Sequence, residues 1–434
     1  MSSQIRSVVF AVAAVGGLVT QAFADIRRVP EQYPTIMAAI EASYDGDVVE
    51  VGPGTYAEGL NLGGREITVR STAGAGQTVV DPVSGRCLTV NGQKGNGARV
   101  EGFTLRGGSA PRGGGVYVES SSPVLVGCVI TGNVSTEGGY YYSGGGGVHV
   151  ASGSPRLVGC TVSQNSARYV GGGMYAGGTV TLEDCVVSGN TLDGSGTSDT
   201  WGGGIYVAGA VTMTGGSVTG NTASGRGGGI DVGGTLSASG VVVGGNVVTR
   251  SDGRGGGVSL SSGTLQLTGC TVTGNGSGGQ GGGLYTSSGQ VTVSGGSVEQ
   301  NDAGGYGGAW YVDGGTPLLQ SCQVRNNGAT TVGGVWVQSG QLRVGGTVFC
   351  GNGVNVNGNW QNLGGNQFNG QCPPGCIGDV NGNEYVDGVD LGEMLARWGL
   401  CEGAPCYADF NSDGYVDGDD LGLLLAAWGP CPRN

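Results

Sequence analysis

The sequence contains very little positive charge and almost no histidine. Lys94 is its single lysine, His149 is its single histidine, and charged residues make up 12% of the chain. The formal net charge is −13, and residues 376–434, with eleven acids and two arginines, carry about −9 of it. A chain of this kind lacks the basic surface that binds nucleic acids or anionic membranes, so we expect neither as a partner.

Long apolar segments are also missing. The apolar run from Val8 to Val19 is too short to span a bilayer, and no other stretch approaches the roughly 20 residues required. This run follows Arg6 and ends at Ala22-Phe23-Ala24, which predicts a secretory signal peptide over residues 1–24. We therefore expect a secreted protein, extracellular or at the cell surface, without an integral membrane segment.

Glycine is the abundant residue, with 99 copies. Collagen is excluded because glycine does not recur at every third position, and disorder is excluded because valine, isoleucine and leucine recur regularly. A unit that contains an asparagine, a short loop and Gly-Gly-Gly-apolar-Tyr-apolar recurs nine times. The middle positions of these triplets are glycines 114, 146, 172, 203, 228, 256, 282, 308 and 334, about 27 residues apart. The eighth triplet ends in Ala309, and the ninth unit has only a glycine pair.

Each unit contains short segments with alternating apolar residues, which predict strands with one inward face. A unit this short cannot bury that face alone, so its copies must stack. No room remains for a crossover helix, which argues against a βαβ sheet. We therefore predict an all-β solenoid of parallel strands over residues 99–372, preceded by a short helix and the first rungs over residues 25–98.

One asparagine in each unit occupies an equivalent turn. Its amide can form hydrogen bonds with the copies above and below, which predicts a ladder that satisfies the turn backbone. The predicted members are Asn133, Asn165, Asn190, Asn221, Asn246, Asn275, Asn301 and Asn352, with Asn326 or Asn327 in the remaining unit.

The residues before the repeats carry a family resemblance. Tyr33 to Ala42 predict a short helix with Thr35 as N-cap, and the segments Gly46 to Tyr56 and Ile67 to Ser71 follow it. This N-terminus resembles the pectin-lyase-like superfamily, in which a short helix caps the open end of the coil. The glycine and asparagine repeats also resemble those of polymorphic outer-membrane proteins. The resemblance covers about residues 26–370 and implies a right-handed parallel β-helix.

The sequence shows no catalytic constellation. Acid–base cleavage requires at least two converging ionisable groups, but the acids of the repeats are scattered. The Gly-His-Gly and paired-aspartate motifs of pectin-cleaving relatives are missing. Arg250, Asp252 and Arg254 form the nearest charged cluster, in a segment that we interpret as a solvated loop. The catalytic residues are therefore unknown, and an extracellular polysaccharide lyase or glycoside hydrolase is an alternative supported only by family association.

A column of mostly aromatic residues lies two positions after the triplets. Its sequence neighbours are apolar, so if they point inward the column points outward. We expect exposed rings that either bind the flat faces of sugars or only stiffen the sheet. The predicted ligand-binding residues are Tyr117, His149, Tyr175, Tyr206, Tyr285, Tyr311 and Trp336, and Asp231 and Ser259 occupy the two intervening positions.

Eleven of the twelve cysteines fall into three groups. One repeat position holds Cys128, Cys160, Cys185, Cys270 and Cys322 but accepts glycine or valine elsewhere, which predicts a small inward corner. Cys350 and Cys372 are placed to tie down the last rung. Near the C-terminus, Cys376 and Cys401, and likewise Cys406 and Cys431, are 25 residues apart and bracket one unit each. We prefer these two bridges among the three connectivities.

Residues 376–434 contain two loop-helix units of about thirty residues each. Oxygen ligands at positions 1, 3, 5, 9 and 12, with a backbone carbonyl at position 7, are typical of a calcium loop. In the first loop these positions are Asp379, Asn381, Asn383, Tyr385, Asp387 and Asp390. In the second they are Asp409, Asn411, Asp413, Tyr415, Asp417 and Asp420. Each loop leads into an amphipathic helix, so we expect calcium as the cofactor.

The paired units resemble a type I dockerin, a module that docks secreted proteins onto cohesin domains. The resemblance implies calcium binding and a cohesin-like partner. Two features depart from the family pattern. The positions that usually carry hydroxyl residues hold Gly388-Val389 and Gly418-Asp419, and the helices end without the usual basic pair. These departures bear on cohesin recognition and leave the calcium ligands intact.

Our leading hypothesis is a non-catalytic β-helix that binds glycan or another cell-surface polymer and is displayed through its calcium module. The polysaccharide-cleaving enzyme is the first alternative, and a purely structural surface protein is the second.

Overall fold

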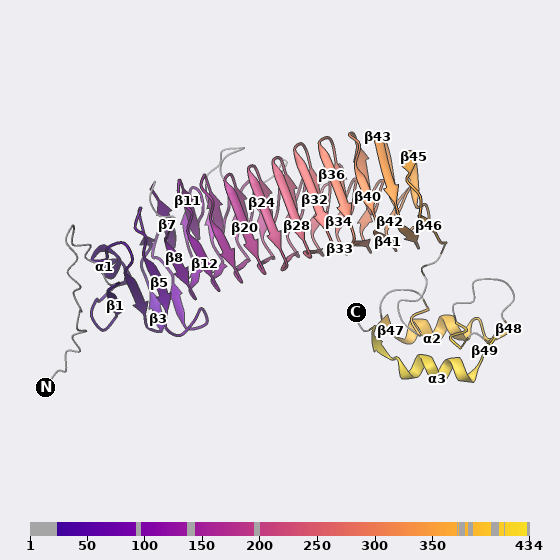
Figure 1. Ribbon diagram of the computed structural model, residues 1–434, viewed down its shortest axis with the longest axis horizontal. Helices are drawn as coiled ribbons and strands as arrows, with labels where there is room; N and C mark the ends of the chain where they lie inside the picture. Colours follow the sequence, from indigo (N-terminus) through magenta and orange to yellow (C-terminus); the bar gives the residue numbers. More distant parts are fainter. Residues whose placement is uncertain are drawn as a thin grey trace, which may run out of the picture.

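The computed structural model describes residues 24–92, 97–136, 144–194, 200–370, 372, 378–380, 385–400, 408–411 and 413–431. Residues 1–23 of the predicted signal peptide lie outside this range. Figure 1 shows a long stack of strands with a short helix at its N-terminal end. Each strand pairs in parallel with its equivalents one rung before and one rung after, so the predicted parallel β-solenoid is confirmed.

Four columns of strands build the solenoid, and the first follows the glycine triplets. This column contains β4 (Leu60–Asn61), β7 (Leu88–Asn91), β11 (Val116–Glu119), β15 (Val148–Val150), β19 (Met174–Ala176), β23 (Ile205–Val207), β27 (Ile230–Val232), β31 (Val258–Leu260), β35 (Leu284–Thr286), β39 (Trp310–Asp313), β43 (Val335–Gly345) and β45 (Val356–Asn362). The last two strands are long enough to belong to the second column as well.

The second column comes next along each rung. It contains β1 (Ile26–Val29), β2 (Val48–Val51), β5 (Thr68–Ser71), β8 (Arg99–Glu101), β12 (Val124–Val126), β16 (Arg156–Val158), β20 (Thr179–Glu183), β24 (Ala210–Thr214), β28 (Thr235–Ser239), β32 (Thr264–Thr268), β36 (Gln290–Ser294) and β40 (Leu318–Gln320).

The third column precedes the ladder asparagines, and the fourth consists of short strands after them. The third contains β3 (Gly54–Tyr56), β6 (Thr78–Val80), β9 (Thr104–Arg106), β13 (Val129–Thr131), β17 (Thr161–Ser163), β21 (Val186–Ser188), β25 (Ser217–Thr219), β29 (Val242–Gly244), β33 (Thr271–Thr273), β37 (Ser297–Glu299), β41 (Gln323–Arg325), β44 (Val348–Cys350) and β46 (Gln367–Phe368). The fourth contains β10 (Ser109–Ala110), β14 (Val134–Ser135), β18 (Ser166–Ala167), β22 (Thr191–Leu192), β26 (Thr222–Ala223), β30 (Val247–Val248), β34 (Gly276–Ser277), β38 (Asp302–Ala303) and β42 (Gly328–Ala329).

The N-terminal end of the solenoid is closed by α1 (Ile36–Glu41), as predicted. The Thr35 hydroxyl accepts a hydrogen bond from the Ala38 backbone N–H at 3.1 Å and so caps the helix. Ile36 and Ile40 are fully buried against the apolar interior. The helix therefore covers inner-face side chains that the first rung would otherwise expose to water.

The predicted asparagine ladder is confirmed, and its uncertain member is Asn327. In a typical step, the backbone N–H and the side-chain N–H of Asn190 both donate to Asn221 Oδ1 at 2.9 Å. The Asn190 amide also donates to the Val162 carbonyl at 2.9 Å. The ladder residues from Asn133 to Asn352 are buried, so every step pairs polar groups that water does not reach.

The glycine triplets combine two separate requirements. Gly171 has φ +58°, a left-handed conformation that glycine adopts without steric penalty. Gly172 has no such requirement, but a Cβ atom on it would collide with the Gly203 carbonyl of the next rung. The first glycine is therefore fixed by the turn and the second by the close approach of neighbouring rungs.

The C-terminal module has a much smaller interior. It contains β47 (Tyr385–Val386), α2 (Gly388–Leu395), β48 (Gly399–Leu400), β49 (Tyr415–Val416), α3 (Gly418–Ala426) and β50 (Gly429–Pro430). β47 pairs antiparallel with β50, and β48 pairs antiparallel with β49, so the strand of each loop pairs with the segment that follows the other unit's helix. The buried apolar residues are Val380, Val386, Met394, Ala408, Val416 and Leu424.

Candidate functional site

The aromatic column predicted from the sequence is aligned in register along the first strand column. Its order is Tyr117, His149, Tyr175, Tyr206, Asp231, Ser259, Tyr285, Tyr311 and Trp336. Neighbouring rings stack: His149 and Tyr175 have centroids 4.5 Å apart, and Tyr285 and Tyr311 have centroids 5.4 Å apart.

The prediction that this column is exposed is wrong. His149 and Tyr285 are 1% exposed, Tyr175 is 5% exposed and Tyr311 is 6% exposed. Tyr117, Tyr206 and Trp336 are partly buried, and these three are the members of the predicted ligand-binding set that retain solvent contact. Most of the column therefore cannot offer ring faces to a polymer.

A second layer of residues, which we call the strap, covers the column. Its members lie directly before the glycine triplets, and β-bridges join them from rung to rung. They are Gly144, Val170, Trp201, Arg226, Arg254 and Gln280. Strap residues and their neighbours contact the rings: Val170 and Trp201 pack around Tyr175 and Tyr206, and the Arg254 guanidinium lies 5.1 Å from the Tyr285 ring centroid. The strap residues stack because each one ends the loop before a glycine triplet, at the same repeat position in successive rungs.

The strap was missed because the sequence prediction considered only the two neighbours of each column residue. A signal was present: the residue before the triplet is often large and flat, as Trp201, Arg226, Arg254 and Tyr306 show. Such side chains cover rings and form cation–π contacts with them. The Arg226 guanidinium, for example, lies 4.1 Å from the Trp201 ring centroid.

The charged loop that we considered as a possible catalytic cluster does not converge. Arg250 forms an exposed ion pair with Asp252 at 2.7 Å, while Arg254 lies over the Tyr285 ring. Among the described residues, no group of three or more histidine, cysteine, aspartate or glutamate side chains is arranged to hold a metal ion.

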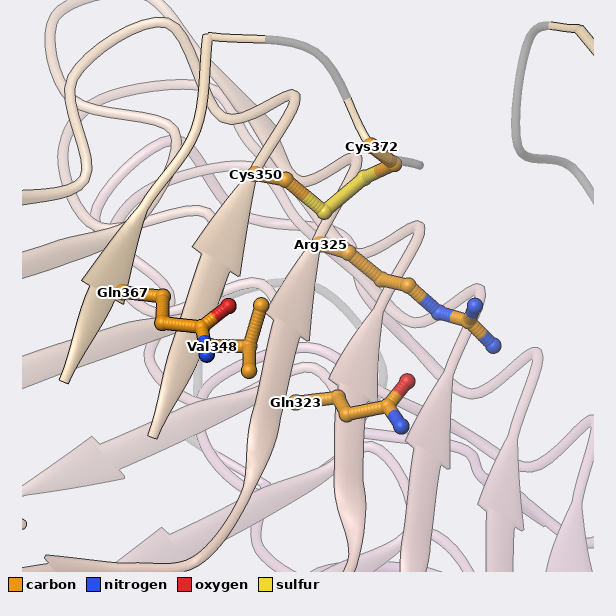
Figure 2. A pocket seen from close by; sticks show the side chains of 6 residues that line it. All are labelled: Gln323, Arg325, Val348, Cys350, Gln367 and Cys372. Carbon is orange, nitrogen blue, oxygen red and sulfur yellow. A yellow bond between two sulfur atoms is a disulfide. The ribbon is translucent and has the colours of Figure 1, made fainter. Parts of the chain in front are cut away.

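A hollow of about 180 Å³ lies on the outer face of β41, β44 and β46 (Figure 2). Gln323, Val348 and Gln367 form a row in register across these strands, and Arg325 lies beside them next to the disulfide. Arg325 Nε donates to Glu299 Oε2 at 2.6 Å, so its charge is already paired. The two carboxamides are the remaining polar groups that line the hollow.

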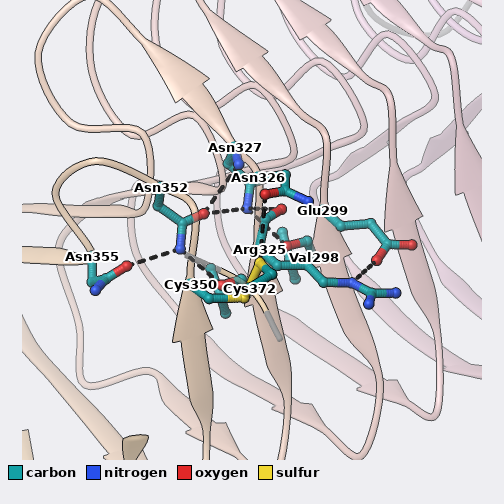
Figure 3. Close-up of a disulfide and its surroundings, with 10 residues drawn as sticks. Val298, Glu299, Arg325, Asn326, Asn327, Cys350, Asn352, Asn355 and Cys372 are labelled. Carbon is teal, nitrogen blue, oxygen red and sulfur yellow. Dashed lines mark hydrogen bonds and ion pairs between the residues drawn. A yellow bond between two sulfur atoms is a disulfide. The ribbon is translucent and has the colours of Figure 1, made fainter. Parts of the chain in front are cut away.

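The expected link between Cys350 and Cys372 is present as a disulfide. Figure 3 shows it beside the last steps of the asparagine ladder, where Asn352 Nδ2 donates to Val324 O at 2.8 Å and Asn355 Oδ1 at 3.0 Å. The bridge fastens residue 372 to the end of β44 and so holds the chain against the final rungs. The five repeat-position cysteines are buried and free, as their small-corner role predicts.

The second calcium-type loop is held together by its own side chains. Asp409 Oδ2 accepts the Gly414 N–H at 2.9 Å, and Asp413 Oδ1 accepts the Tyr415 N–H at 2.9 Å. Asp420 is fully buried and accepts the Phe410 N–H at 2.7 Å and the Asp417 N–H at 3.0 Å. These bonds curl the loop around its oxygen side chains and place Asp420 beneath it.

The first loop is described only in part. Asp379 and Asp390 are fully buried, and Asp390 accepts the Val380 N–H at 2.9 Å and the Asp387 N–H at 2.9 Å. The latter two contacts repeat those of Asp420, and the Tyr385 backbone carbonyl holds the same loop position as that of Tyr415. The predicted ligands Asn381 and Asn383 lie outside the described residues.

Cys431 is disulfide-bonded, and its sulfur lies 3.7 Å from Asp379 Oδ2 of the other unit. Cys376, Cys401 and Cys406 lie outside the described residues. The geometry thus places the last cysteine beside the first loop, a fact that bears on the pairing we predicted.

Comparison with known proteins defines the solenoid further. A family model described as a right-handed β-helix region matches residues 87–298. This segment, slightly less than half of the chain, is similar to that family. The match lies within the β-helix rungs that carry the asparagine ladder and the strap, and it confirms the predicted handedness.

The chain is also similar to a cell surface glycoprotein of Methanothermus fervidus. The two are 31% identical over 118 residues, which is 26% of this chain and 18% of the glycoprotein. The matching part thus spans less than a fifth of that protein's length. Every helix that the structure describes is too short or too polar to cross a membrane.

Proposed function

We propose that this protein is a secreted surface β-helix attached through a calcium-dependent docking module. One observation carries the proposal: the module exposes the same three apolar side chains on each of its two units. They are Tyr385, Leu395 and Trp398 on the first unit, and Tyr415, Leu425 and Trp428 on the second, all between 48% and 52% exposed. Large apolar side chains exposed together usually mark an interaction surface.

The module's helices explain why these residues are exposed. Leu395 directly follows Met394, and Leu425 directly follows Leu424, yet only Met394 and Leu424 reach the interior. A helix of this size buries one narrow stripe, so the adjacent leucine remains outside. On each helix, one apolar residue (Met394 or Leu424) therefore packs in the core, while its neighbour (Leu395 or Leu425) lies on a surface that a partner could cover.

The residue types of the second loop suit a calcium ion, and binding would have to draw together its four aspartates, which do not converge on one point in this structure. Asp409, Asn411, Asp413, Asp417 and Asp420, with the Tyr415 carbonyl, would hold it in the second loop, because calcium prefers six to eight oxygen ligands. Four carboxylates within twelve residues repel one another, and a divalent cation relieves that repulsion. When bound, calcium would supply a rigid anchor for the loop and the start of α3.

The β-helix itself is proposed as a rigid surface body without catalytic activity. The covered column removes the exposed rings on which a glycan platform would depend. The similarity to a cell surface glycoprotein supports a surface location. A polysaccharide or another cell-surface polymer remains an expected partner of the β-helix. A cohesin-like domain is the partner that the module's resemblance implies.

The docking proposal is tested by isothermal titration of the full chain with a panel of cohesin domains, in calcium and in EDTA. We expect binding that calcium permits and EDTA abolishes. The double variant Leu395→Asp/Leu425→Asp should lose binding while calcium titration remains unchanged. The double variant Val83→Asp/Val354→Asp, at exposed apolar residues outside the module, is the matched control.

The non-catalytic part is tested with a polysaccharide panel. The intact protein should produce no new reducing or unsaturated chain ends on any polymer. Release of such ends, absent from a heat-inactivated sample, would establish the enzymatic alternative.

A further inference from the structure

The aromatic column has a break in its middle. Asp231 and Ser259 occupy two consecutive positions between Tyr206 and Tyr285, in register with both. Rungs repeat at about 4.8 Å, so the two tyrosines lie roughly 14 Å apart. A continuous stack would place two further rings in this interval.

The side chains in the break are buried polar groups without full hydrogen bonding. Asp231 is 1% exposed and Ser259 is 0% exposed. Within the described part of the chain, Asp231 Oδ1 and Ser259 Oγ have no hydrogen-bond partner. Burial raises the pKa of the Asp231 carboxyl, while the nearby Arg226 charge opposes that rise. Leaving such a group unpaired costs about 1–3 kcal/mol.

Arg226 of the strap covers this break. Its Nη1 donates to Ser261 Oγ at 2.8 Å, and its guanidinium stacks on Trp201, whose ring centroid lies 6.1 Å from that of Tyr206. Arg226 Nε, however, has no hydrogen-bond partner among the described residues. An unused donor therefore lies near an unused acceptor, which shows that arginine satisfies this environment only in part.

The surroundings of Arg226 have the composition of a cation site. Trp201 and Tyr206 offer aromatic faces, and Asp231 offers a carboxyl group in a place that water does not reach. Aromatic faces attract organic cations most strongly where the cation loses its water. Trp201, Tyr206 and Arg226 all retain partial solvent contact, so a ligand can reach the site from outside.

We propose that Trp201, Tyr206, Asp231 and Ser259 form a binding site for an amino sugar, and that Arg226 is its internal occupant. The ligand's ammonium group would pair with Asp231 and displace the arginine side chain toward solvent. Its ring would take the position beside Tyr206 where the stack lacks a ring, and its hydroxyls would bond to Ser259. This site is independent of the calcium module.

Glucosamine, N-acetylglucosamine and glucose are the probes, because they share a ring and differ in charge. Binding to the full chain is measured by calorimetry and by tryptophan fluorescence. Arg226→Gln removes the competing charge and shortens the side chain while keeping a polar end, so this variant should bind glucosamine at least tenfold more tightly than the unaltered protein. Adding Asp231→Asn should abolish that gain. Asp252→Asn, at an exposed carboxylate, is the matched control and should change nothing.

A second variant keeps the proposal testable if Arg226→Gln fails to fold. Ser259→Tyr should supply a missing ring, raise the melting temperature and abolish glucosamine binding. The proposal is overturned if Arg226→Gln binds no better than the unaltered protein, or if N-acetylglucosamine binds as well as glucosamine. It is also overturned if Ser259→Tyr leaves binding intact, or if arginine methyl ester binds more tightly than glucosamine, which would indicate a peptide partner. Asp420→Ala should leave all these affinities unchanged, so failure here is separable from failure of the docking proposal.

Discussion

The β-helix and the C-terminal module keep their folds by different means. The β-helix has a continuous apolar interior and nine ladder asparagines, each bonded to the next. Among its described residues, the module has six buried apolar side chains, and four of them are valine or alanine. A core this small rarely stabilises an independent unit by itself, and the calcium ions and disulfides that we propose would supply the missing stabilisation.

This difference predicts how far the effect of a substitution spreads in each part. Loss of one contact in a solenoid is felt mainly by the neighbouring rungs, because each rung touches only the next. In the module, each loop strand pairs with the other unit, so damage to one unit removes partners from both. Substitutions of similar size should therefore have larger effects in the module than in the β-helix.

The largest effect is expected from the buried carboxylates of the calcium loops. Asp420→Ala should remove the tighter of two calcium-binding steps, and Asp390→Ala the weaker. The second loop has four carboxylates and Gly414 at the sharp turn, where φ is +94°, whereas the first has three carboxylates and Glu384 at that position. At calcium concentrations about a thousandfold above Kd, each step contributes about 4 kcal/mol.

Calorimetry measures the two steps, and circular dichroism with and without EDTA follows the module's helices. The melting transition of the β-helix should not move. The opposite assignment of the two steps would show that helix packing, and not loop chemistry, sets the affinities.

A comparable effect is expected from the module's disulfides. Each predicted bridge within a unit joins cysteines that are 25 residues apart. Closing a loop of this length stabilises a fold by about 3–4 kcal/mol in the chain-entropy model. The sequence predicts bridges within each unit, Cys376 to Cys401 and Cys406 to Cys431. Because Cys431 lies beside Asp379 of the first loop, bridges between the units are the alternative to test. Peptide mapping under non-reducing conditions decides between them. A Cys406–Cys431 peptide would support the bridges within each unit.

In the β-helix, the buried rings of the aromatic column should contribute to folding stability. Tyr175→Ala removes a buried ring stacked between His149 and Tyr206, so we expect destabilisation of about 3 kcal/mol. Tyr44→Ala, at a ring that is 79% exposed, is the matched control and should change stability by less than about 0.5 kcal/mol. Chemical denaturation measures both. Equal effects of the two variants would contradict the observed covering of the column.

One step of the asparagine ladder should contribute somewhat less. Asn221→Ala removes the acceptor of two Asn190 donors and the donor to the Val187 carbonyl, which predicts a loss of about 2 kcal/mol. Asn359→Ala, at an exposed asparagine that donates to the Gly340 carbonyl, is the control. Hydrogen exchange should show the loss confined to the rungs around residue 221.

The smallest effect is the pH dependence from Asp231. Burial raises the pKa of its carboxyl, so folding favours the protonated form. Its stabilising contribution is complete below about pH 4, the ordinary aspartate range, and declines as pH rises through the folded pKa. The decline is at most about 1.4 kcal/mol per pH unit. Asp231→Asn should remove it, and parallel stability–pH curves for the two proteins would exclude this role for Asp231.

The sequence by itself determined the repeating architecture. Inward valines and leucines recur with period two, each unit is too short to stand alone, and one asparagine per unit needs a partner in the next. Thr35 and the apolar residues after it likewise predicted the first helix, and the family resemblance implied that it caps the coil. These features are local and are repeated many times, so a single physical rule accounts for all of them.

Only the tertiary structure decided which residues cover the outward-pointing side chains of the aromatic column. Alternation correctly directed Tyr175 and Tyr285 away from the interior, but it carries no information about a loop from the adjacent rung. Trp201, Arg226 and Arg254 cover the column because stacking brings residues from separate units to one level, and the same stacking leaves Asp231 buried. In the module, the pairing of β47 with β50 places Cys431 beside Asp379, more than fifty residues away in sequence. Contacts between chain segments so distant depend on how the units pack against one another, which no local pattern specifies.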